Sequence, residues 1–595
     1  MWLISLGFGF GKTRAVRCYV TLLIWIIIVS LGLYWLLTGN GKSEIWSREQ
    51  HQHRWEPKEV YGPEEQITEK KLTVKEVKSS RKKIWDDTKE FDGYLHSSIS
   101  RLCNPPEEIA VEDENLQITD MKLDAVVIIF RHGDRGPLSH VGSRNLSLIN
   151  CSSDHPDFQK FYRFSADSMT KLTGYTQFIG PFHSFQKVPT TSQCHLGQLS
   201  QLGSWQLIQL GKAIQSAYQS SLFNSPTPSN HGSSLSVASV FSNSSYSVPV
   251  GSVNPMQNIK VVAYSTRYRR TLQSLMAFLY GLLGPKLIIP NVTVRESQSI
   301  NFCFNDCSCR ATERLKKLAS KKFRPSSAEK ATMISLVNQI NAIIGLEKTK
   351  KSGTSLLDLL LVYSCHKTDF PCRSKSLIRK VHSGSVSDEC ITHEDVSSLV
   401  YLLQKESQQQ RKIQANRQLY LLTSYGLLKE IVNLALKMTS SSHPQTSSDN
   451  SWSSPFANAG VGPRTKLAIF SGHDTTLQSL TGALGIFTGH PDIHLVPYAS
   501  RLIFEFYRKT NVPPNSARKH FLRVVYNGQA VTHLVRFCDD GSSKNPDNRS
   551  QGTPTRNILC PLENLVRFLH DHYFESFSNA TNYKDACQKK GKKRK

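Results

Sequence analysis

Three short apolar runs, far apart along the chain, each end in a turn that carries arginine or histidine. The runs cover residues 125–130, 261–264 and 467–470. Each has the length and composition of a buried strand, and apolar residues at helical spacing follow the second and third, over 272–282 and 477–484. Buried strands that alternate with helices favour an α/β fold built on a mostly parallel sheet.

The turns at the ends of these runs carry arginine, histidine and aspartate. They are Arg-His-Gly-Asp-Arg-Gly-Pro at 131–137, Ser-Thr-Arg-Tyr-Arg-Arg-Thr at 265–271 and Ser-Gly-His-Asp-Thr-Thr at 471–476. If the strands are parallel neighbours, the turns meet at one edge of the sheet, where ligands bind. The N-termini of the following helices then add amides that bind anions. Taken alone, an Arg-His pair favours a basic surface turn, and His473-Asp474 is also consistent with a helix cap.

The sequence RHGDR at 131–135, combined with the distant HD at 473–474, resembles the histidine acid phosphatases, and the similarity extends over residues 123–587. The resemblance implies a three-layer α/β sandwich with a mostly parallel central sheet and an inserted helical cap domain. By residue match, it implies that His132 attacks the phosphorus as nucleophile and that Asp474 donates a proton to the leaving oxygen. It also implies a set of phosphate-binding residues, namely Arg131, Arg135, Arg270 and His473.

These residue types suit the hydrolysis of a phosphate monoester. Such a group carries close to two negative charges at neutral pH, so guanidinium groups and an imidazole can neutralise it and stabilise the charge of the transition state. Neighbouring cations disfavour protonation of His132, whereas a bound phosphate dianion favours the protonated form of Asp474. The expected reaction requires no metal and no cofactor.

Several segments narrow the resemblance to the 2-phosphoxylose phosphatases. They are residues 303–309, 364–372, 498–505, 560–568 and 581–587. The resemblance implies removal of the 2-O-phosphate from xylose in the glycosaminoglycan-protein linkage region, with phosphorylated glycans on proteoglycan core proteins as partners. One alternative is a broad-specificity acid phosphatase or phytase, lumenal or secreted. Another is a non-catalytic Golgi protein that binds phosphoglycans, although a binder needs the arginines and not the nucleophile and acid together.

Residues 18–37 form a run of twenty residues without charge, long enough for one transmembrane helix. Three basic residues, Lys12, Arg14 and Arg17, precede it and predict a cytoplasmic tail over 1–17. A cleaved signal peptide is the alternative, but its apolar core is normally about 7 to 15 residues long. We therefore expect a single-pass membrane protein with a lumenal catalytic domain, and the resemblance to the 2-phosphoxylose phosphatases implies a type II protein of the Golgi.

The remaining chain divides by composition and periodicity into a lumenal stem, a phosphatase domain in two halves, a helical cap and a basic tail. The expected boundaries are 38–100 for the stem, 101–309 and 436–587 for the phosphatase domain, 310–435 for the cap and 588–595 for the tail. Ser-rich segments at 220–258 and 439–460 predict surface insertions. Residues 197–203 match a family segment beside the active site, where Ser200 is expected either to cap a helix or to take part in catalysis.

Cysteines and glycosylation sequons agree with a lumenal location. Of the 13 cysteines one, Cys18, lies in the apolar run, which leaves an even twelve for disulfides, with their pairing open. Cys303, Cys307 and Cys309 could instead bind a metal, although an oxidising compartment favours disulfides. The candidate glycosylation sites are Asn145, Asn150, Asn243, Asn291, Asn548 and Asn579.

The formal net charge of +26 does not predict nucleic-acid binding, because no recognised binding module accompanies it. Part of the excess lies in the stem and in the basic tail, where a solvated charge run is the favoured interpretation. A basic surface can also concentrate polyanions, so an anionic proteoglycan is the expected partner. The sequence leaves the oligomeric state open.

Overall fold

The structure is a computed structural model of the chain, and it describes the greater part of the residues after position 97. The described residues are 98–139, 149–172, 177–179, 182, 185–190, 192–223, 260–284, 292–346, 351–373, 389–439, 465–513, 519–538, 558–578 and 580–588. The predicted transmembrane helix at 18–37 lies outside them, as do nearly all of the stem and of the basic tail. Of the six candidate glycosylation sites only Asn150 is described, and its side chain is exposed.

A mixed sheet of nine strands forms the centre of the described fold, in the order β10-β9-β8-β1-β7-β3-β4-β2, with β11 paired to β9. The strands are β1 Met121–Arg131, β2 Gln177–Ile179, β3 Lys260–Thr266, β4 Val292–Ser297, β7 Thr465–Gly472, β8 Arg501–Lys509, β9 His520–Tyr526, β10 Gln529–Ala530 and β11 Cys560–Pro561. The three predicted strands are therefore β1, β3 and β7, and they lie next to one another in the order β1-β7-β3.

The expectation of a mostly parallel sheet is wrong, because only one half of it is parallel. The pairs that link β1, β7, β3, β4 and β2 are parallel. The pairs that link β1, β8, β9, β10 and β11 are antiparallel. Strands β8 and β9 are joined by a short connection, which permits an antiparallel hairpin but not a parallel crossover. This second half was not assigned as strands from the sequence.

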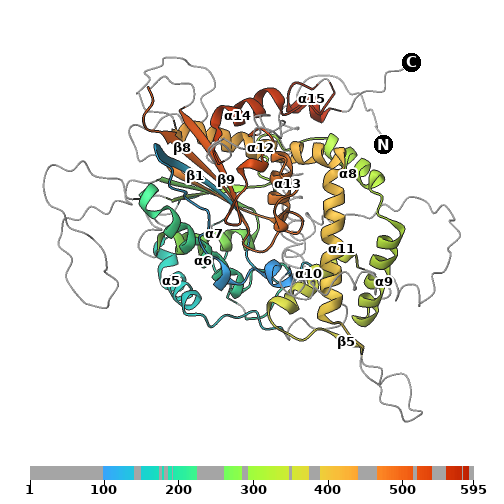
Figure 1. Ribbon diagram of the computed structural model, residues 1–595. Helices are drawn as coiled ribbons and strands as arrows, with labels where there is room; N and C mark the ends of the chain where they lie inside the picture. The colour runs from blue at the N-terminus through green and yellow to red at the C-terminus, as the bar shows by residue number, and fades with distance from the viewer. Residues whose placement is uncertain are drawn as a thin grey trace, which may run out of the picture. The chain divides into compact units, whose positions relative to one another are not determined.

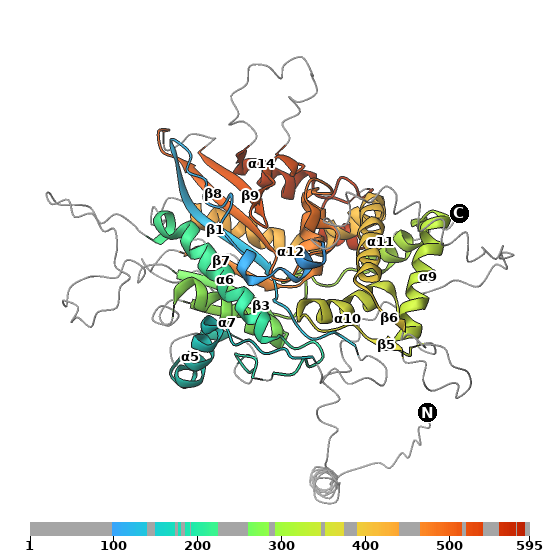
Figure 2. The same cartoon turned by 60° about the horizontal axis from the view of Figure 1, so that its bottom comes forward.

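Helices cover both faces of the sheet, as a three-layer α/β sandwich requires. Along β1, Ala125, Val127 and Ile129 face one apolar core, whereas the residues between them face the other. One core contains α5 Pro156–Leu172, α6 Gln201–Tyr218 and α7 Arg269–Leu283. The other contains α8 Ala311–Lys322, α12 Gln414–Thr439, α13 Asp474–Leu484, α14 Leu562–Arg567 and α15 Tyr583–Cys587. Figures 1 and 2 show α6 and α7 on one side of the sheet and α12 and α14 on the other.

The helices expected in the cap, residues 310–435, divide between two cores. Helices α9 Ser327–Ile343, α10 Gly353–Cys365 and α11 His393–Lys412 supply most of a third apolar cluster, and they lie together in both views (Figures 1 and 2). A two-stranded sheet, β5 Cys372–Arg373 with β6 Glu389–Cys390, lies between α10 and α11 in sequence. Helices α8 and α12 instead pack on the central sheet, because their apolar side chains belong to its core.

Short helical turns complete the described elements. They are η1 Pro106–Glu108, η4 Gln219–Phe223, η7 Pro491–Ile493, η8 Thr532–Leu534 and η12 Phe568–His572. Among the described helices, α12 alone is both long and apolar enough to cross a membrane, with 56% of its most apolar window buried inside the protein. Since α12 contributes to the core beside the sheet, we interpret it as a core helix.

All twelve cysteines after Cys18 form disulfides, which confirms the expectation from their even number. The pairs are Cys103–Cys365, Cys151–Cys194, Cys303–Cys307, Cys309–Cys587, Cys372–Cys390 and Cys538–Cys560. The alternative of a metal site at Cys303, Cys307 and Cys309 is therefore wrong for this structure, because each of these sulfurs is bonded to another sulfur.

Candidate active site

The three predicted turns meet at one edge of the sheet. In the parallel register Arg131 lies opposite Gly472, and Ser265 lies opposite Ser471. The amide of His132 extends this pairing by donating to the carbonyl of Gly472 at 3.0 Å. The expected convergence is confirmed, and it follows from the placement of β1, β7 and β3 as parallel neighbours.

The ring of His132 is held in one orientation and one tautomer. Only 2% of the residue is exposed, and its Nδ1 lies 2.8 Å from the carbonyl oxygen of Gly133. A carbonyl oxygen can only accept, so Nδ1 carries the proton and Nε2 keeps a lone pair. Burial lowers the pKa of His132 well below its ordinary value, and the charges of Arg270 and Arg131 lower it further. The imidazole is therefore neutral and nucleophilic at Nε2.

Three arginines surround this histidine, and each has one N–H group without a hydrogen-bond partner among the described residues. Arg131 donates to the carbonyl of Val496 and stacks on the ring of Tyr498, with 4.2 Å from its guanidinium carbon to the ring centroid. Within the described part of the chain, the buried Nε atoms of Arg131, Arg135 and Arg270 have no hydrogen-bond partner. Buried N–H groups are normally paired, so this set is suited to an anion with several acceptor oxygens.

Arg135 and Arg270 differ in the charged groups that lie next to them. Nη2 of Arg135 lies 2.8 Å from the carboxylate of Asp358, which offsets one positive charge. Burial lowers the pKa of Arg135, but Asp358 outweighs it, so the pKa stands above its ordinary value. Burial and the charge of Arg135 lower the pKa of Arg270 to about 10. Arg270 stacks on the ring of Tyr268 at 4.5 Å, and it remains charged at neutral pH.

His473 lies beside His132, with 5.5 Å between the two ring centroids. Its Nε2 is 2.9 Å from Oγ1 of Thr266, and its Nδ1 is 3.4 Å from Nη2 of Arg270. The guanidinium can only donate, so Nδ1 accepts and Nε2 carries the proton. Burial lowers the pKa of His473 well below its ordinary value, and Arg270 adds to this effect. His473 is thus a neutral hydrogen-bonding group at the site.

Asp474 is the first residue of α13, and the residue that precedes the helix is His473. His473 is therefore the N-cap residue, so the alternative interpretation of this pair as a helix cap applies to His473 and not to Asp474. Its Oδ2 lies 3.6 Å from Nη2 of Arg131, and 40% of its side chain is exposed. Desolvation raises the pKa of Asp474, but the charges of Arg131 and Arg135 outweigh it, so the net shift is downward. The carboxylate is ionised until a bound dianion offsets these charges.

The loop after β1 packs closely against residues 197–203, as the family segment predicts. Ser200 caps α6, since its Oγ accepts from the amide of Gly203 at 2.8 Å. A Cβ at Gly203 would lie 2.2 Å from the carbonyl oxygen of Asp134, and one at Gly133 would lie 2.2 Å from the carbonyl oxygen of Gly203. Both positions need glycine, because only a hydrogen atom fits between the two backbones.

Three residues of the site were missed from the sequence. Asp358 lies in the apolar helix α10 and was not assigned to the site. A lone carboxylate in such a helix could have indicated it, because a buried charge needs a partner of opposite charge. Tyr498 lies beneath Arg131, and its buried hydroxyl has no partner among the described residues. His366 contacts the loop after β1 through Asp134 at 2.7 Å. Nothing in the local sequence pointed to these two contacts.

The chain is similar in sequence to known phosphatases over most of its length. The sequence pattern described as "Histidine phosphatase superfamily (branch 2)" matches residues 122–527. The chain is 26% identical to 2-phosphoxylose phosphatase 1 of Xenopus tropicalis over 508 residues, which cover 82% of each chain. It is 25% identical to 2-phosphoxylose phosphatase 1 of Homo sapiens over 497 residues, covering 82% of this chain and 86% of that one. A solved structure of Hafnia alvei phytase superposes with a TM-score of 0.41 and 14% identity, covering 80% of this chain and all of the phytase.

Proposed function

Because this chain belongs to branch 2 of the histidine phosphatase superfamily, we propose that it hydrolyses phosphate monoesters through a phosphohistidine at His132. It is a phosphoric monoester hydrolase, as its family and its phosphatase relatives show. The observation that carries the proposed mechanism is the fixed tautomer of His132, whose Nδ1 proton is bound to the carbonyl of Gly133 while Nε2 keeps its lone pair.

The first proposed step transfers the phosphoryl group to the enzyme. Nε2 of His132 attacks the phosphorus and forms the nitrogen–phosphorus bond, while the bond from phosphorus to the ester oxygen breaks. Asp474 gives its proton to the leaving oxygen, so the alcohol departs neutral. Arg131, Arg135 and Arg270 hold the phosphoryl oxygens and stabilise their charge in the transition state.

The second proposed step releases phosphate. The carboxylate of Asp474 takes a proton from water, and the water oxygen attacks the phosphorus as the bond to His132 breaks. His473 supports both steps as a neutral imidazole, because burial and the charge of Arg270 disfavour its protonation. To bind phosphate, its Nε2–H, which is hydrogen-bonded to Oγ1 of Thr266 here, would donate to a phosphoryl oxygen instead. Rapid-quench labelling tests this mechanism: a phosphohistidine, which is stable in alkali and labile in acid, is expected in the wild type and absent in His132→Ala.

As substrate we propose the 2-O-phosphate of xylose in the linkage region of proteoglycans. The support is the similarity to 2-phosphoxylose phosphatase 1 over 82% of the chain. Phosphate release is compared for a 2-phosphoxylose linkage glycan, p-nitrophenyl phosphate and inositol hexakisphosphate. We expect the highest kcat/KM for the glycan. A higher kcat/KM for inositol hexakisphosphate would instead indicate a phytase, and equal values for all three a broad acid phosphatase.

We also propose that the enzyme is a Golgi membrane protein with residues 18–37 as its anchor. The support is the uncharged run of twenty residues and the basic residues before it. Protease protection of microsomes tests the topology. A lumenal catalytic domain stays intact until detergent is added, whereas digestion without detergent would contradict the proposed orientation.

A further inference from the structure

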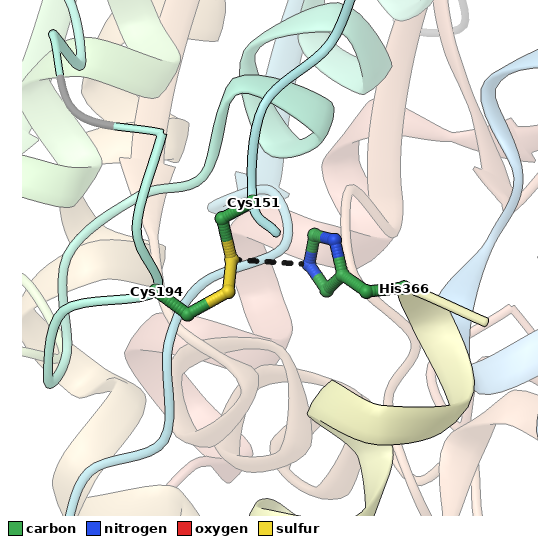
Figure 3. A group of neighbouring side chains, drawn as sticks. All are labelled: Cys151, Cys194 and His366. Atoms are coloured by element: carbon green, nitrogen blue, oxygen red, sulfur yellow. Dashed lines mark hydrogen bonds between the residues drawn. A yellow bond between two sulfur atoms is a disulfide. The ribbon is translucent and has the colours of Figure 1, made fainter. Parts of the chain in front are cut away.

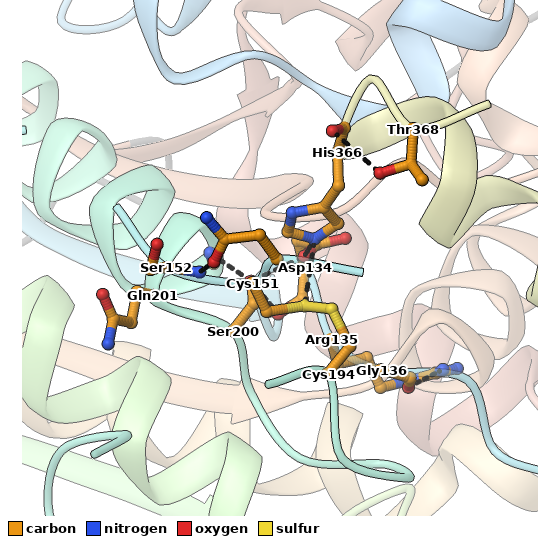
Figure 4. The surroundings of a disulfide bond; sticks show 12 residues. Asp134, Arg135, Gly136, Cys151, Ser152, Cys194, Ser200, Gln201, His366 and Thr368 are labelled. Carbon is orange, nitrogen blue, oxygen red and sulfur yellow. Dashed lines mark hydrogen bonds and ion pairs between the residues drawn. A yellow bond between two sulfur atoms is a disulfide. The ribbon is translucent and has the colours of Figure 1, made fainter. Parts of the chain in front are cut away.

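Asp134 is the one charged residue of the RHGDR segment that has no part in the proposed chemistry. Its side chain is fully buried, and its Oδ2 accepts a hydrogen bond from Oγ of Ser200 at 2.5 Å and lies 2.7 Å from Nε2 of His366 (Figure 4). Its Oδ1 has no partner among the described residues. A buried carboxylate with incomplete hydrogen bonding is costly, so the hydrogen-bond donors that remain to it, among them His366, matter.

His366 comes from a different part of the fold. It follows α10 directly, a helix of the third apolar cluster, whereas Asp134 lies in the loop after β1. Only 4% of its side chain is exposed. Burial lowers the pKa of His366, but the charge of Asp134 outweighs it and leaves the pKa above its ordinary value. This pair therefore links the cluster of α10 to the loop that carries the proposed nucleophile.

Two disulfides fix the position of this imidazole. Cys365, the residue before His366, is bonded to Cys103. On the other side, Sγ of Cys151 lies 3.4 Å from Nε2 of His366, and Cys151 is bonded to Cys194 (Figure 3). The atoms of Cys151, Cys194 and His366 are close enough to hold a metal ion. The two sulfurs are bonded to each other, however, so they are not thiolate ligands for a metal. The His366 ring instead contacts the carboxylate of Asp134.

A closed ring of contacts results. The amide of Asp134 donates to Oε1 of Gln206 at 2.7 Å, and Nε2 of Gln206 donates to the carbonyl of Cys103 at 2.6 Å. Cys103 is bonded to Cys365 by a disulfide. The next residue, His366, contacts the carboxylate of Asp134 and so closes the ring. Both the backbone and the side chain of Asp134 are thus tied to one covalent bridge.

Asp134 lies between two residues of the site, His132 and Arg135, so its position sets theirs. We propose that His366 is a positioning residue for the phosphatase reaction, which holds Asp134 and through it the orientation of His132 and Arg135. The inference depends on phosphatase activity and not on the glycan substrate proposed above.

Two substitutions of similar size and polarity test this role. In His366→Gln the side-chain amide nitrogen reaches about as far as Nε2 and can still donate to Asp134. In His366→Asn the amide is shorter and cannot reach. Displacement of reacting groups by about 1 Å costs on the order of 100-fold in rate. We therefore expect kcat for p-nitrophenyl phosphate to fall about 10- to 100-fold in His366→Asn, with KM changed less than about threefold, and to stay within about threefold of wild type in His366→Gln.

The matched control is His572→Asn, which removes an exposed histidine that pairs with Glu575 at 2.6 Å. This variant is expected to keep the wild-type kcat. Thermal unfolding of each variant shows that it is folded at the assay temperature. The proposal is overturned if folded His366→Asn keeps kcat within about twofold of wild type, or if the Gln and Asn variants lose equal activity. An inactive wild type would instead contradict the phosphatase assignment itself.

A double-mutant cycle with Asp134→Asn gives a second readout. If His366 acts through Asp134, the double variant loses no more kcat than the more impaired single variant, because the two residues act as a unit. Losses that multiply would show that His366 acts by another route and would overturn the proposal.

Discussion

Replacement of the proposed acid by Asp474→Asn separates protonation of the leaving group from binding. The amide keeps the shape of the side chain but cannot donate a proton of carboxylic acidity. On a sugar phosphate, whose leaving alkoxide is strongly basic, we expect kcat to fall about 10²- to 10⁴-fold, since that is the usual contribution of general acid catalysis. At about 1.4 kcal/mol per tenfold change, the barrier rises by about 3 to 5 kcal/mol.

The loss of the ion pair with Arg131 is the competing effect of this substitution. The two groups are 3.6 Å apart, and 40% of the Asp474 side chain is exposed. Because Arg131 is itself buried, with 7% of its side chain exposed, loss of the pair is expected to lower kcat for every leaving group alike, whereas loss of the proton affects only strongly basic leaving groups. Arg131 also keeps its contacts with Val496 and Tyr498, so its position should not change. The rate effect is therefore expected to report the proton.

Leaving groups of different basicity provide the assay. The p-nitrophenolate ion departs without protonation, so its kcat should fall less than about tenfold in Asp474→Asn. Asp157→Asn is the matched control, because Asp157 also pairs with a cation, Lys212 at 2.6 Å, but lies on α5. Equal losses for the sugar phosphate and for p-nitrophenyl phosphate would refute the assignment of Asp474 as the acid.

Three further predictions concern charge, stability and backbone packing. The charge of Arg270 adds to burial in lowering the pKa of His132, so Arg270→Gln should raise this pKa. Because protonated His132 cannot attack, the acid limb of the pH profile of kcat/KM should then move to higher pH. Glu505→Ala leaves Arg523, 1% exposed and 2.8 Å from Glu505, buried without its charge partner, so the free energy of unfolding in urea should fall by about 3 to 5 kcal/mol. Gly203→Ala forces a methyl group against the backbone of the loop after β1, so stability should fall by about 1 to 3 kcal/mol and kcat should fall with it.

Each of these predictions has a matched control. Arg267→Gln removes an arginine that pairs with Glu296 and is half exposed, so an equal shift of the acid limb in this variant would contradict the charge argument. Glu575→Ala removes an exposed carboxylate and should leave unfolding unchanged. Gly353→Ala places a methyl group 3.3 to 3.5 Å from flexible side chains; the packing argument fails if it is as harmful as Gly203→Ala.

The centre of the fold and of the site could be predicted from the sequence because their signals are local. Strands β1, β3 and β7 are continuous apolar runs that end in charged turns, and parallel neighbours must end at one edge. The antiparallel half of the sheet was missed. Its strand β8, Arg501–Lys509, places Arg501 and Glu505 among apolar residues, and these buried charges interrupt the pattern of a core strand. Arg501 pairs with Glu114, which lies far away in the sequence. Glu505 pairs with Arg523 on the next strand, β9.

The groups around the predicted site residues could not be found from the sequence, because they depend on long-range contacts. Asp358 and His366 reach the loop after β1 from a helix more than two hundred positions later in the chain. The pairing of twelve cysteines likewise depends on which segments meet in three dimensions, and spacing alone did not choose among the possibilities.

The order of strands in the sheet also has a consequence for biosynthesis. Strand β1 lies between β7 and β8, which leave the ribosome more than three hundred residues after it. Synthesis proceeds at about 5 to 20 residues per second, so the neighbouring strands are made on the order of 15 to 70 seconds after β1. The six apolar residues of β1 are all 0% exposed in the finished protein, and they stay unpaired during this time. A newly made chain must therefore be protected from aggregation over this interval, and a fragment that ends before β7 has no route to the native sheet.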